Sequence, residues 1–289
     1  MVEQASKGYF PAGDANAQLN KIPFARALGL TWQGGNHDGV SLRLPYSALT
    51  RNKSTDAVDD RAMVALIDHS CSAAVYAALD RQTLIATLDL RIEFAAPPPL
   101  RQDIVCEAKM IHLASTFALV RAEARCAATG QVLAFASSCY IVGSNPGKGA
   151  NTPPAKNLFE AVPEAAYLTP TADGFDELVA MQIGADRTDV AFVPHLIGAP
   201  SLPSLHGGVT ASALITEARQ RAAGSDARAS SFALVTLSMQ YLRAGQAKPL
   251  SAIATVRKAG GRAVVVEAGV FQDNGSRHVS QGELLFVAG

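Results

Sequence analysis

The stretch LHGGVTASALITEA, residues 205–218, places a histidine and two glycines directly before small and aliphatic residues that are typical of a buried helix. Glycines at a helix start let another molecule approach the backbone closely, and the first N–H groups of a helix have no partner within it. Such N–H groups attract the negative charge that develops on a carbonyl oxygen during nucleophilic attack. His206, Gly207 and Gly208, the HGG motif, are therefore a candidate oxyanion site. Taken alone, the motif also fits a tight turn with a packed histidine.

A second residue that could take part in catalysis is Asp68, in the apolar segment AMVALIDHSCS. Its neighbours include Leu66, Ile67 and Ala73, and a carboxylate buried among such residues is costly unless it gains hydrogen bonds. A carboxylate in this setting can act as a nucleophile or a general base. A solvated carboxylate, or one bonded to nearby backbone, is the alternative interpretation.

The bulk composition predicts a globular protein of two domains. The chain has 289 residues, 48% hydrophobic and 17% charged, with 25 basic and 25 acidic side chains. This balance gives no electrostatic footprint of a nucleic-acid partner. The N-terminal residues lack the apolar core of a signal peptide, and no apolar run is long enough for a membrane span. We therefore expect a soluble, cytoplasmic protein without a membrane partner.

The order of predicted elements occurs twice. Residues 144–170, rich in Gly, Pro, Asn and Ala, indicate a linker between an N-terminal repeat, 1–143, and a C-terminal repeat, 171–289. In the first repeat a short strand and a helix precede segments of period two, at 40–45, 59–79, 83–97, 103–130 and 131–143. In the second repeat the corresponding segments are 188–194, 206–223, 231–245, 249–275 and 276–289.

The spacing of matching landmarks supports a tandem duplication. Four pairs of residues are separated by between 145 and 149 positions, a narrow range for independent features. The glycine hairpins ATGQVLAF and DNGSRHVS also correspond in type. The four pairs are Asp59 and His206, Thr87 and Thr236, Gly130 and Gly275, and Gly143 and Gly289.

A duplicated helix-plus-meander opened by HGG resembles the hotdog fold, and more narrowly the thioesterases of the phenylacetate-degradation and 4-hydroxybenzoyl-CoA type. The resemblance covers nearly the whole chain after about the first twenty residues. It implies an α+β double hotdog in which each half is a long central helix wrapped by an antiparallel β-sheet. We expect the two sheets to join at their edges, the two helices to run antiparallel, and the chain to form a homo-oligomer.

In the family that the chain resembles, an acidic residue stands nine positions after the histidine of the HGG motif. It acts as nucleophile or general base, a backbone N–H near the glycines polarises the thioester carbonyl, and the two roles come from opposite subunits of a hotdog dimer. Here the residue nine positions after His206 is Ile215, whereas the first repeat has Asp59-Asp60-Arg61 and, nine positions after Asp59, Asp68. The resemblance thus implies one composite site, the HGG motif with Asp68, and one degenerate site.

Glu217 is a weaker candidate for the catalytic acid. It precedes Thr236 by 19 residues, the spacing between Asp68 and Thr87, so an alignment anchored on the following strands makes Glu217 the equivalent of Asp68. The two additional residues would then lie within the first turns of the helix. Because two residues rotate a helix by about 200°, Glu217 and Ile215 cannot both face the site in a regular helix.

Supporting residues carry weaker signals. Thr87 aligns with a Ser/Thr position that some relatives use to hydrogen-bond the acid or the attacking water, although threonine is also an ordinary strand residue. Many relatives carry Asn or Gln six residues before the HGG histidine, where this chain has Pro200, with Ser201 and Ser204 nearby. His69 points about 100° away from Asp68 on a helix and is expected to be a packed or exposed side chain.

The expected function is acyl-CoA hydrolysis to a carboxylic acid and free CoA. The histidines and cysteines show no metal-ligand spacing, so no metal is expected, and the reaction needs no cofactor. A protein that binds acyl-CoA without hydrolysing it is the main alternative. Hotdog hydratases fit less well, since their Asp/His motif before the helix is not evident. Candidates for contacts to CoA phosphates are Arg61, Arg91, Arg101 and Arg243.

Overall fold

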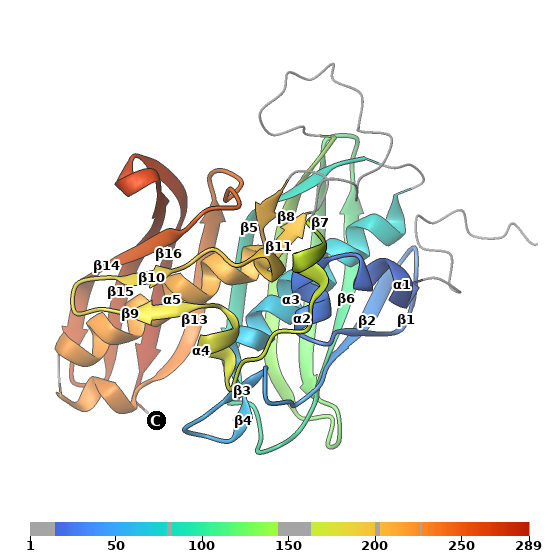
Figure 1. Cartoon of the computed structure of the whole chain (residues 1–289). Helices are drawn as coiled ribbons and strands as arrows, with labels where there is room; N and C mark the ends of the chain where they lie inside the picture. Colours follow the sequence, from blue (N-terminus) through green and yellow to red (C-terminus); the bar gives the residue numbers. More distant parts are fainter. Residues whose placement is uncertain (1–14, 80–82, 144–162, 200–202, 226, 289) are drawn as a thin grey trace, which may run out of the picture.

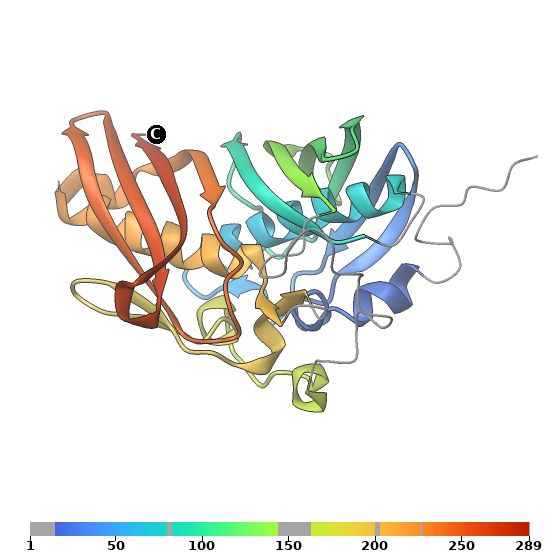
Figure 2. The ribbon, with the colours of Figure 1, turned by 90° about the horizontal axis from the view of Figure 1, so that it is seen from above.

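The computed structural model describes residues 15–79, 83–143, 163–199, 203–225 and 227–288. Two halves lie side by side, and each has one long helix packed on an antiparallel sheet (Figures 1 and 2). This is the double hotdog that the duplication predicts. Residues 144–162 of the predicted linker lie outside the described residues.

The N-terminal half is built around a long helix, α3. Its helices are α1 (Ala15–Asn20), α2 (Pro23–Ala27) and α3 (Asp60–Ala78), and its strands are β1 (Thr31–Asn36), β2 (Gly39–Leu44), β3 (Arg51–Asn52), β4 (Ala57–Val58), β5 (Ile85–Phe94), β6 (Ile104–Leu113), β7 (Phe117–Cys126) and β8 (Val132–Val142).

The C-terminal half repeats this order around the helix α5. Its elements are η1 (Glu164–Tyr167), α4 (Phe175–Leu178), β9 (Met181–Ile183), β10 (Thr188–Val190), η2 (Pro194–Leu196), β11 (Ile197–Ala199), β12 (Ser204–Leu205), α5 (Gly207–Ser225), η3 (Ala227–Ser231), β13 (Ala233–Tyr241), β14 (Leu250–Gly260), β15 (Ala263–Gln272), η4 (Asp273–Gly275) and β16 (Arg277–Val287). Here η denotes a short 3₁₀ helix.

The sheets of the two halves join into one sheet of 12 strands. Its order is β1-β2-β6-β7-β8-β5-β13-β16-β15-β14-β10-β9, so β5 and β13 meet at the centre. They pair antiparallel, from Thr236 opposite Glu93 to Gln240 opposite Asp89. This pairing satisfies the backbone groups that would be an exposed edge in either half alone. The continuous sheet agrees with the expected edge-to-edge arrangement.

The two long helices pack against each other and run antiparallel. Arg61, in the first turn of α3, contacts Thr216 in the middle of α5, whereas Asp68, further along α3, lies against Gly207 at the start of α5. The helices are buried almost all round, because each lies between its own half-sheet and the opposite helix. Small residues on both surfaces permit this close approach.

The long helices and the central strands of the two repeats keep one residue offset. Both α3 and α5 have 19 residues, and Asp60 corresponds to Gly207 as the first residue of each. A register irregularity lies between Thr87 and Asp89 in β5 and between Leu234 and Thr236 in β13, so Leu234 is the counterpart of Thr87. The second half therefore has no extra residues between its helix and its central strand, and the counterpart of Asp68 is Ile215.

The predicted meanders correspond to observed strands in both halves, and the predicted hairpin glycines Gly130 and Gly275 have φ of 72° and 90°. These are left-handed values that glycine adopts most readily. Two hairpin partners were not predicted from the sequence. They are β1, which pairs with β2, and β9, which pairs with β10. The segment of β1, TWQGGN, contains two glycines and has no buried position, so its pattern is not that of a core strand.

Candidate active site

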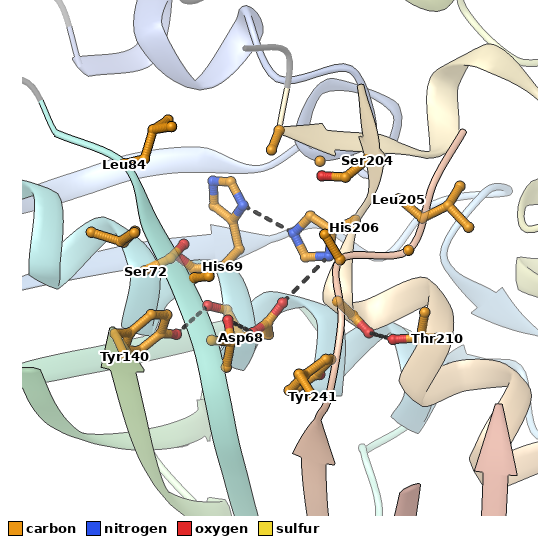
Figure 3. Close-up of a pocket in the computed structure, with 18 of the residues that line it drawn as sticks. Asp68, His69, Ser72, Leu84, Tyr140, Ser204, Leu205, His206, Thr210 and Tyr241 are labelled. Carbon is orange, nitrogen blue, oxygen red and sulfur yellow. Dashed lines mark hydrogen bonds and ion pairs between the residues drawn. The ribbon is translucent and has the colours of Figure 1, made fainter. Parts of the chain in front are cut away.

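The structure brings the HGG motif and Asp68 together across the interface between the halves (Figure 3). Asp68 lies in the middle of α3, and His206 immediately precedes α5. The Nδ1 atom of His206 is 3.6 Å from the Oδ2 atom of Asp68. Both side chains are almost fully buried, with 5% and 7% exposure of His206 and Asp68. Residues from opposite repeats therefore form one cluster.

Each glycine of the motif is required by a close approach. A Cβ atom on Gly207 would lie 2.6 Å from Asp68 Oδ2, so any side chain there would displace the carboxylate. A Cβ atom on Gly208 would lie 2.7 Å from the Cα atom of Ala65, within the backbone of α3. The first glycine makes room for the carboxylate, and the second lets the helices approach. The two positions thus require glycine for different physical reasons.

The start of α5 is held from outside the helix. Leu205 and His206 donate their backbone N–H groups to the carbonyls of Gly245 and Leu196. Gly207 is the first helical residue, so its N–H group has no acceptor within the helix. Within the part of the chain that the structure describes, no other acceptor bonds this group. It is available to a ligand.

Burial raises the pKa of Asp68 to about 7, and hydrogen bonds from Thr87 and the Gly208 backbone oppose this increase. The Thr87 hydroxyl lies 3.4 Å from Asp68 Oδ1, a long contact. Tyr140 donates its hydroxyl to the backbone carbonyl of Asp68 at 3.2 Å, which fixes this turn of α3. A carboxyl group with such a pKa is half ionised near neutral pH, where general bases act most efficiently.

His206 and His69 form a hydrogen-bonded pair with defined tautomers. Gly208 N–H donates to His206 Nδ1 at 2.9 Å, so the proton of neutral His206 is on Nε2. His206 Nε2 lies 3.2 Å from His69 Nδ1, to which it donates, and the proton of His69 is then on Nε2. Burial lowers the pKa of both, that of His69 to about 4. His69 is a packed histidine, as expected, but it also orients His206.

These residues line a cavity of about 380 Å³ between the two halves. The cavity is mainly apolar, with Asp68, His69, Thr87, Ser204 and Tyr241 as polar groups near the helix start. An apolar cavity with a few convergent polar groups and a carboxyl of shifted pKa is typical of a small-molecule site. Apolar lining residues include Leu19, Ile22, Trp32, Leu84, Ile85 and Ile141.

Sequence reasoning missed Tyr241, at the end of β13, and the N-terminal residues that line the cavity. Tyr241 belongs to an alternating strand pattern in which nothing distinguishes it from a core residue. Leu19 and Ile22 precede the region of resemblance, and their role depends on how α1 and α2 pack. Pro200 and Ser201 lie outside the described residues, and Ser204 lines the cavity.

The corresponding position at the start of α3 contains ion pairs. Asp59 caps the helix by accepting from Arg61 N–H and also bonds the Arg61 guanidinium. Arg61 contacts Thr216 and Asp176 as well, and Asp60 pairs with Arg219. These charged groups are therefore paired within the protein.

Glu217 is not brought to the cavity. It accepts a hydrogen bond from Thr188 at 2.9 Å and pairs with Arg221 at 2.8 Å, on the side of α5 that faces β10. The structure thus places the main candidate Asp68, but not Glu217, beside the HGG motif.

The family of the chain follows from a match in both halves. The model of the thioesterase superfamily matches residues 62–133 and 202–277, which together make up half of the chain. The chain belongs to this superfamily. Each matched segment contains one long helix and the strands after it, so the family unit occurs twice. Thioester hydrolysis is therefore the general activity of this thioesterase.

The fold likeness to solved thioesterases extends over nearly the whole chain. A tesB protein from Mycobacterium avium subsp. paratuberculosis has 14% identity and a TM-score of 0.58 over 96% of this chain and 99% of its own. An acyl-CoA thioesterase II from Mycobacterium marinum has 14% identity and a TM-score of 0.53, with 93% and 96% covered. A 12:0-ACP thioesterase from Umbellularia californica has 9% identity and a TM-score of 0.55, with 86% and 93% covered. No curated protein matches the chain.

Two further findings concern the described residues of this thioesterase. None of their helices has the length and apolar character that crossing a membrane requires. Among the same residues, no group of three or more His, Cys, Asp or Glu side chains is placed to hold a metal ion.

Proposed function

We propose that this thioesterase hydrolyses acyl-CoA at one composite site, formed by Asp68 from the first repeat and the HGG motif from the second. The observation that carries the proposal is the approach of a buried carboxylate to an open helix N-terminus. Its Oδ2 atom lies 2.6 Å from the point that a Cβ atom on Gly207 would occupy. A nucleophilic or basic group thus lies beside a donor that faces the same cavity.

The geometry supports the following chemistry. Asp68, as general base, takes a proton from water while the water oxygen bonds to the thioester carbonyl carbon, and the carbonyl π electrons move to its oxygen. Gly207 N–H stabilises this oxyanion. When the carbonyl re-forms, the carbon–sulfur bond breaks, and the departing thiolate takes up the proton that Asp68 holds. The same carboxylate could instead attack the carbonyl carbon directly and be released by water.

Two features of the cavity support an acyl-CoA substrate. Its apolar lining, which includes Leu19, Trp32 and Leu84, suits an acyl group. Of the four arginines considered for CoA phosphates, Arg243 is exposed and lines the cavity, whereas Arg61 is held in buried ion pairs. We assign the phosphate end of CoA to Arg243.

The proposal is tested by free-thiol release from a panel of acyl-CoAs by the wild type and Asp68→Asn. Removal of the base should lower turnover roughly 100-fold or more, while acyl-CoA binding persists. Glu217→Gln is the matched control, because it changes a buried carboxylate on the other helix and should leave turnover nearly unchanged.

The outcomes separate the alternatives. If Glu217→Gln abolished turnover and Asp68→Asn left it intact, the site would be on the opposite side of the pseudo-dimer. If the wild type bound acyl-CoA and released no thiol from any member of the panel, the chain would be a binding protein.

A further inference from the structure

The hydroxyl group of Tyr241 is buried and has no hydrogen-bond partner among the described residues. Buried polar groups in native proteins are nearly always bonded, so an exception needs a reason. Other polar groups around Asp68 have partners, since the Thr87 hydroxyl bonds its carboxylate and the Tyr140 hydroxyl bonds its backbone carbonyl. Tyr241 is thus an unused donor in the wall of the cavity.

The position of Tyr241 places its ring beside the proposed reacting groups. Its Cε1 atom lies 3.2 Å from the point that a Cβ atom on Gly207 would occupy, and Asp68 Oδ2 lies 2.6 Å from the same point. The tyrosine ring, the carboxylate and the helix start therefore surround one small space (Figure 3). Tyr241 comes from β13, whose pairing with β5 is fixed by the central sheet.

The Tyr241 hydroxyl keeps its proton under the conditions in which Asp68 acts. Burial and the nearby charge of Asp68 raise the pKa of Tyr241 well above its ordinary value. A protonated phenol is a hydrogen-bond donor. No hydrogen bond between this hydroxyl and the Asp68 carboxylate occurs in the described structure, so donation remains open to a ligand.

We propose that Tyr241 is a catalytic residue whose hydroxyl donates to the thioester carbonyl oxygen, together with Gly207 N–H. This inference rests on the proposed hydrolysis at Asp68. As the carbonyl carbon gains its bond to the attacking oxygen, negative charge accumulates on the carbonyl oxygen, and both hydrogen bonds strengthen. Tyr241 retains its proton throughout. It supplies the second donor that the start of α5 does not, because Gly208 N–H is already engaged by His206 Nδ1 and the Asp68 carboxylate.

The test is Tyr241→Phe, assayed by thiol release and by thermal unfolding. We expect kcat to fall roughly 100-fold, as for other oxyanion donors, with little change in KM. The thermal midpoint should stay equal or rise, because the substitution removes an unpaired buried hydroxyl. The acid limb of the pH profile should stay in place, because it reports Asp68.

Two tyrosines serve as controls. Tyr167→Phe, which removes a surface hydroxyl bonded to the Lys21 carbonyl, should change neither kcat nor the thermal midpoint. Tyr140→Phe, which removes the hydroxyl that donates to the backbone carbonyl of Asp68, should lower the thermal midpoint. The contrast between Tyr140 and Tyr241 distinguishes a structural hydroxyl from one kept for a ligand.

Three outcomes would overturn the inference. An unchanged kcat for Tyr241→Phe, with an active wild type and an inactive Asp68→Asn, would reject the catalytic role of Tyr241 and leave the proposed function in place. A reduced kcat with a thermal midpoint lowered like that of Tyr140→Phe would make the hydroxyl structural. A wild type without thiol release would end both proposals.

Discussion

The starts of α3 and α5 occupy equivalent places in the two repeats but have opposite contents. At α5, two glycines leave an open N–H group beside a cavity and the buried carboxyl of Asp68. At α3, the Asp59 carboxylate accepts from Arg61 N–H, as His206 Nδ1 accepts from Gly208 N–H at α5, and the Arg61 guanidinium pairs with Asp59 and Asp176. An anionic group stabilises the positive end of a helix dipole. The first repeat supplies an anionic cap, Asp59, whereas the second has a neutral histidine cap beside a cavity.

The difference shows how a duplicated chain can specialise its two equivalent positions. In a symmetric dimer each subunit must carry both parts of the site, whereas one chain with two repeats can change each copy separately. Here Ile215 occupies the position equivalent to Asp68, and ion pairs fill the space beside it. We interpret the start of α5 with Asp68 as the catalytic position and the start of α3 with its ion pairs as a structural one.

The largest expected effect concerns the structural position. Arg61→Met keeps much of the side-chain volume but leaves the buried Asp59 carboxylate without its guanidinium partner. Breaking a buried ion pair in this way costs about 3–5 kcal/mol, so the thermal midpoint should fall by roughly 6 °C or more. The kcat of the folded variant should match the wild type, measured well below its midpoint.

Arg125→Met is the control for that variant, because Arg125 pairs with Glu123 on the surface and its loss should cost about 1 kcal/mol or less. The sequence alone predicts that Asp59→Ala is nearly silent for activity, and the structure adds that it should be destabilising. A large loss of kcat in folded Arg61→Met would contradict the division into catalytic and structural positions.

The next effect concerns the catalytic position. Gly207→Ala puts a methyl group 2.6 Å from the present position of Asp68 Oδ2, so the carboxylate must move. A displacement of about 1 Å in a reacting group can cost roughly 100-fold in rate, or about 2.7 kcal/mol of barrier. Steady-state thiol release by Gly207→Ala and the wild type measures this loss of rate.

Gly224→Ala is the matched substitution in the same helix, at a position with no heavy atom within 4 Å of the added Cβ. It should leave kcat unchanged and stabilise the protein by up to about 1 kcal/mol, because alanine favours helix. Equal rates for Gly207→Ala and the wild type would show that the carboxylate position does not matter.

The smallest effect is expected at Thr87. Under the proposed mechanism the carboxylate form of Asp68, whose pKa is about 7, is the active form, so kcat/KM should rise with pH up to that value and then level off. Thr87→Val removes a hydrogen bond that lowers this pKa. The acid limb should therefore move to higher pH, with a loss of roughly threefold near pH 7 because the contact is long. A pH–rate profile unchanged in Thr87→Val would exclude this contact in the active form.

Much of the arrangement was predictable because it depends on local patterns. The alternation of apolar residues predicted the meanders, and the hairpin glycines 130 and 275 aligned the repeats. The position of Glu217 was not predictable. Its spacing to Thr236 matches that of Asp68 to Thr87, and a sequence does not reveal which strand residues are structurally equivalent. The equal lengths of α3 and α5 and the register irregularities of β5 and β13 make Leu234, not Thr236, the counterpart of Thr87.

The sequence by itself determined the duplication and the complementary residues of the two repeats, Asp68 in one and the HGG motif in the other, because these depend on residue type and spacing. The tertiary structure alone decided which groups are free. The ion pair of Arg61 with Asp176 and the bond between His206 and His69 join residues distant in sequence, and the unpaired state of the Tyr241 hydroxyl depends on the packing around it. Hydrogen bonds and burial act over a few ångströms in space, and only the packed helices and the joined sheet fix those distances.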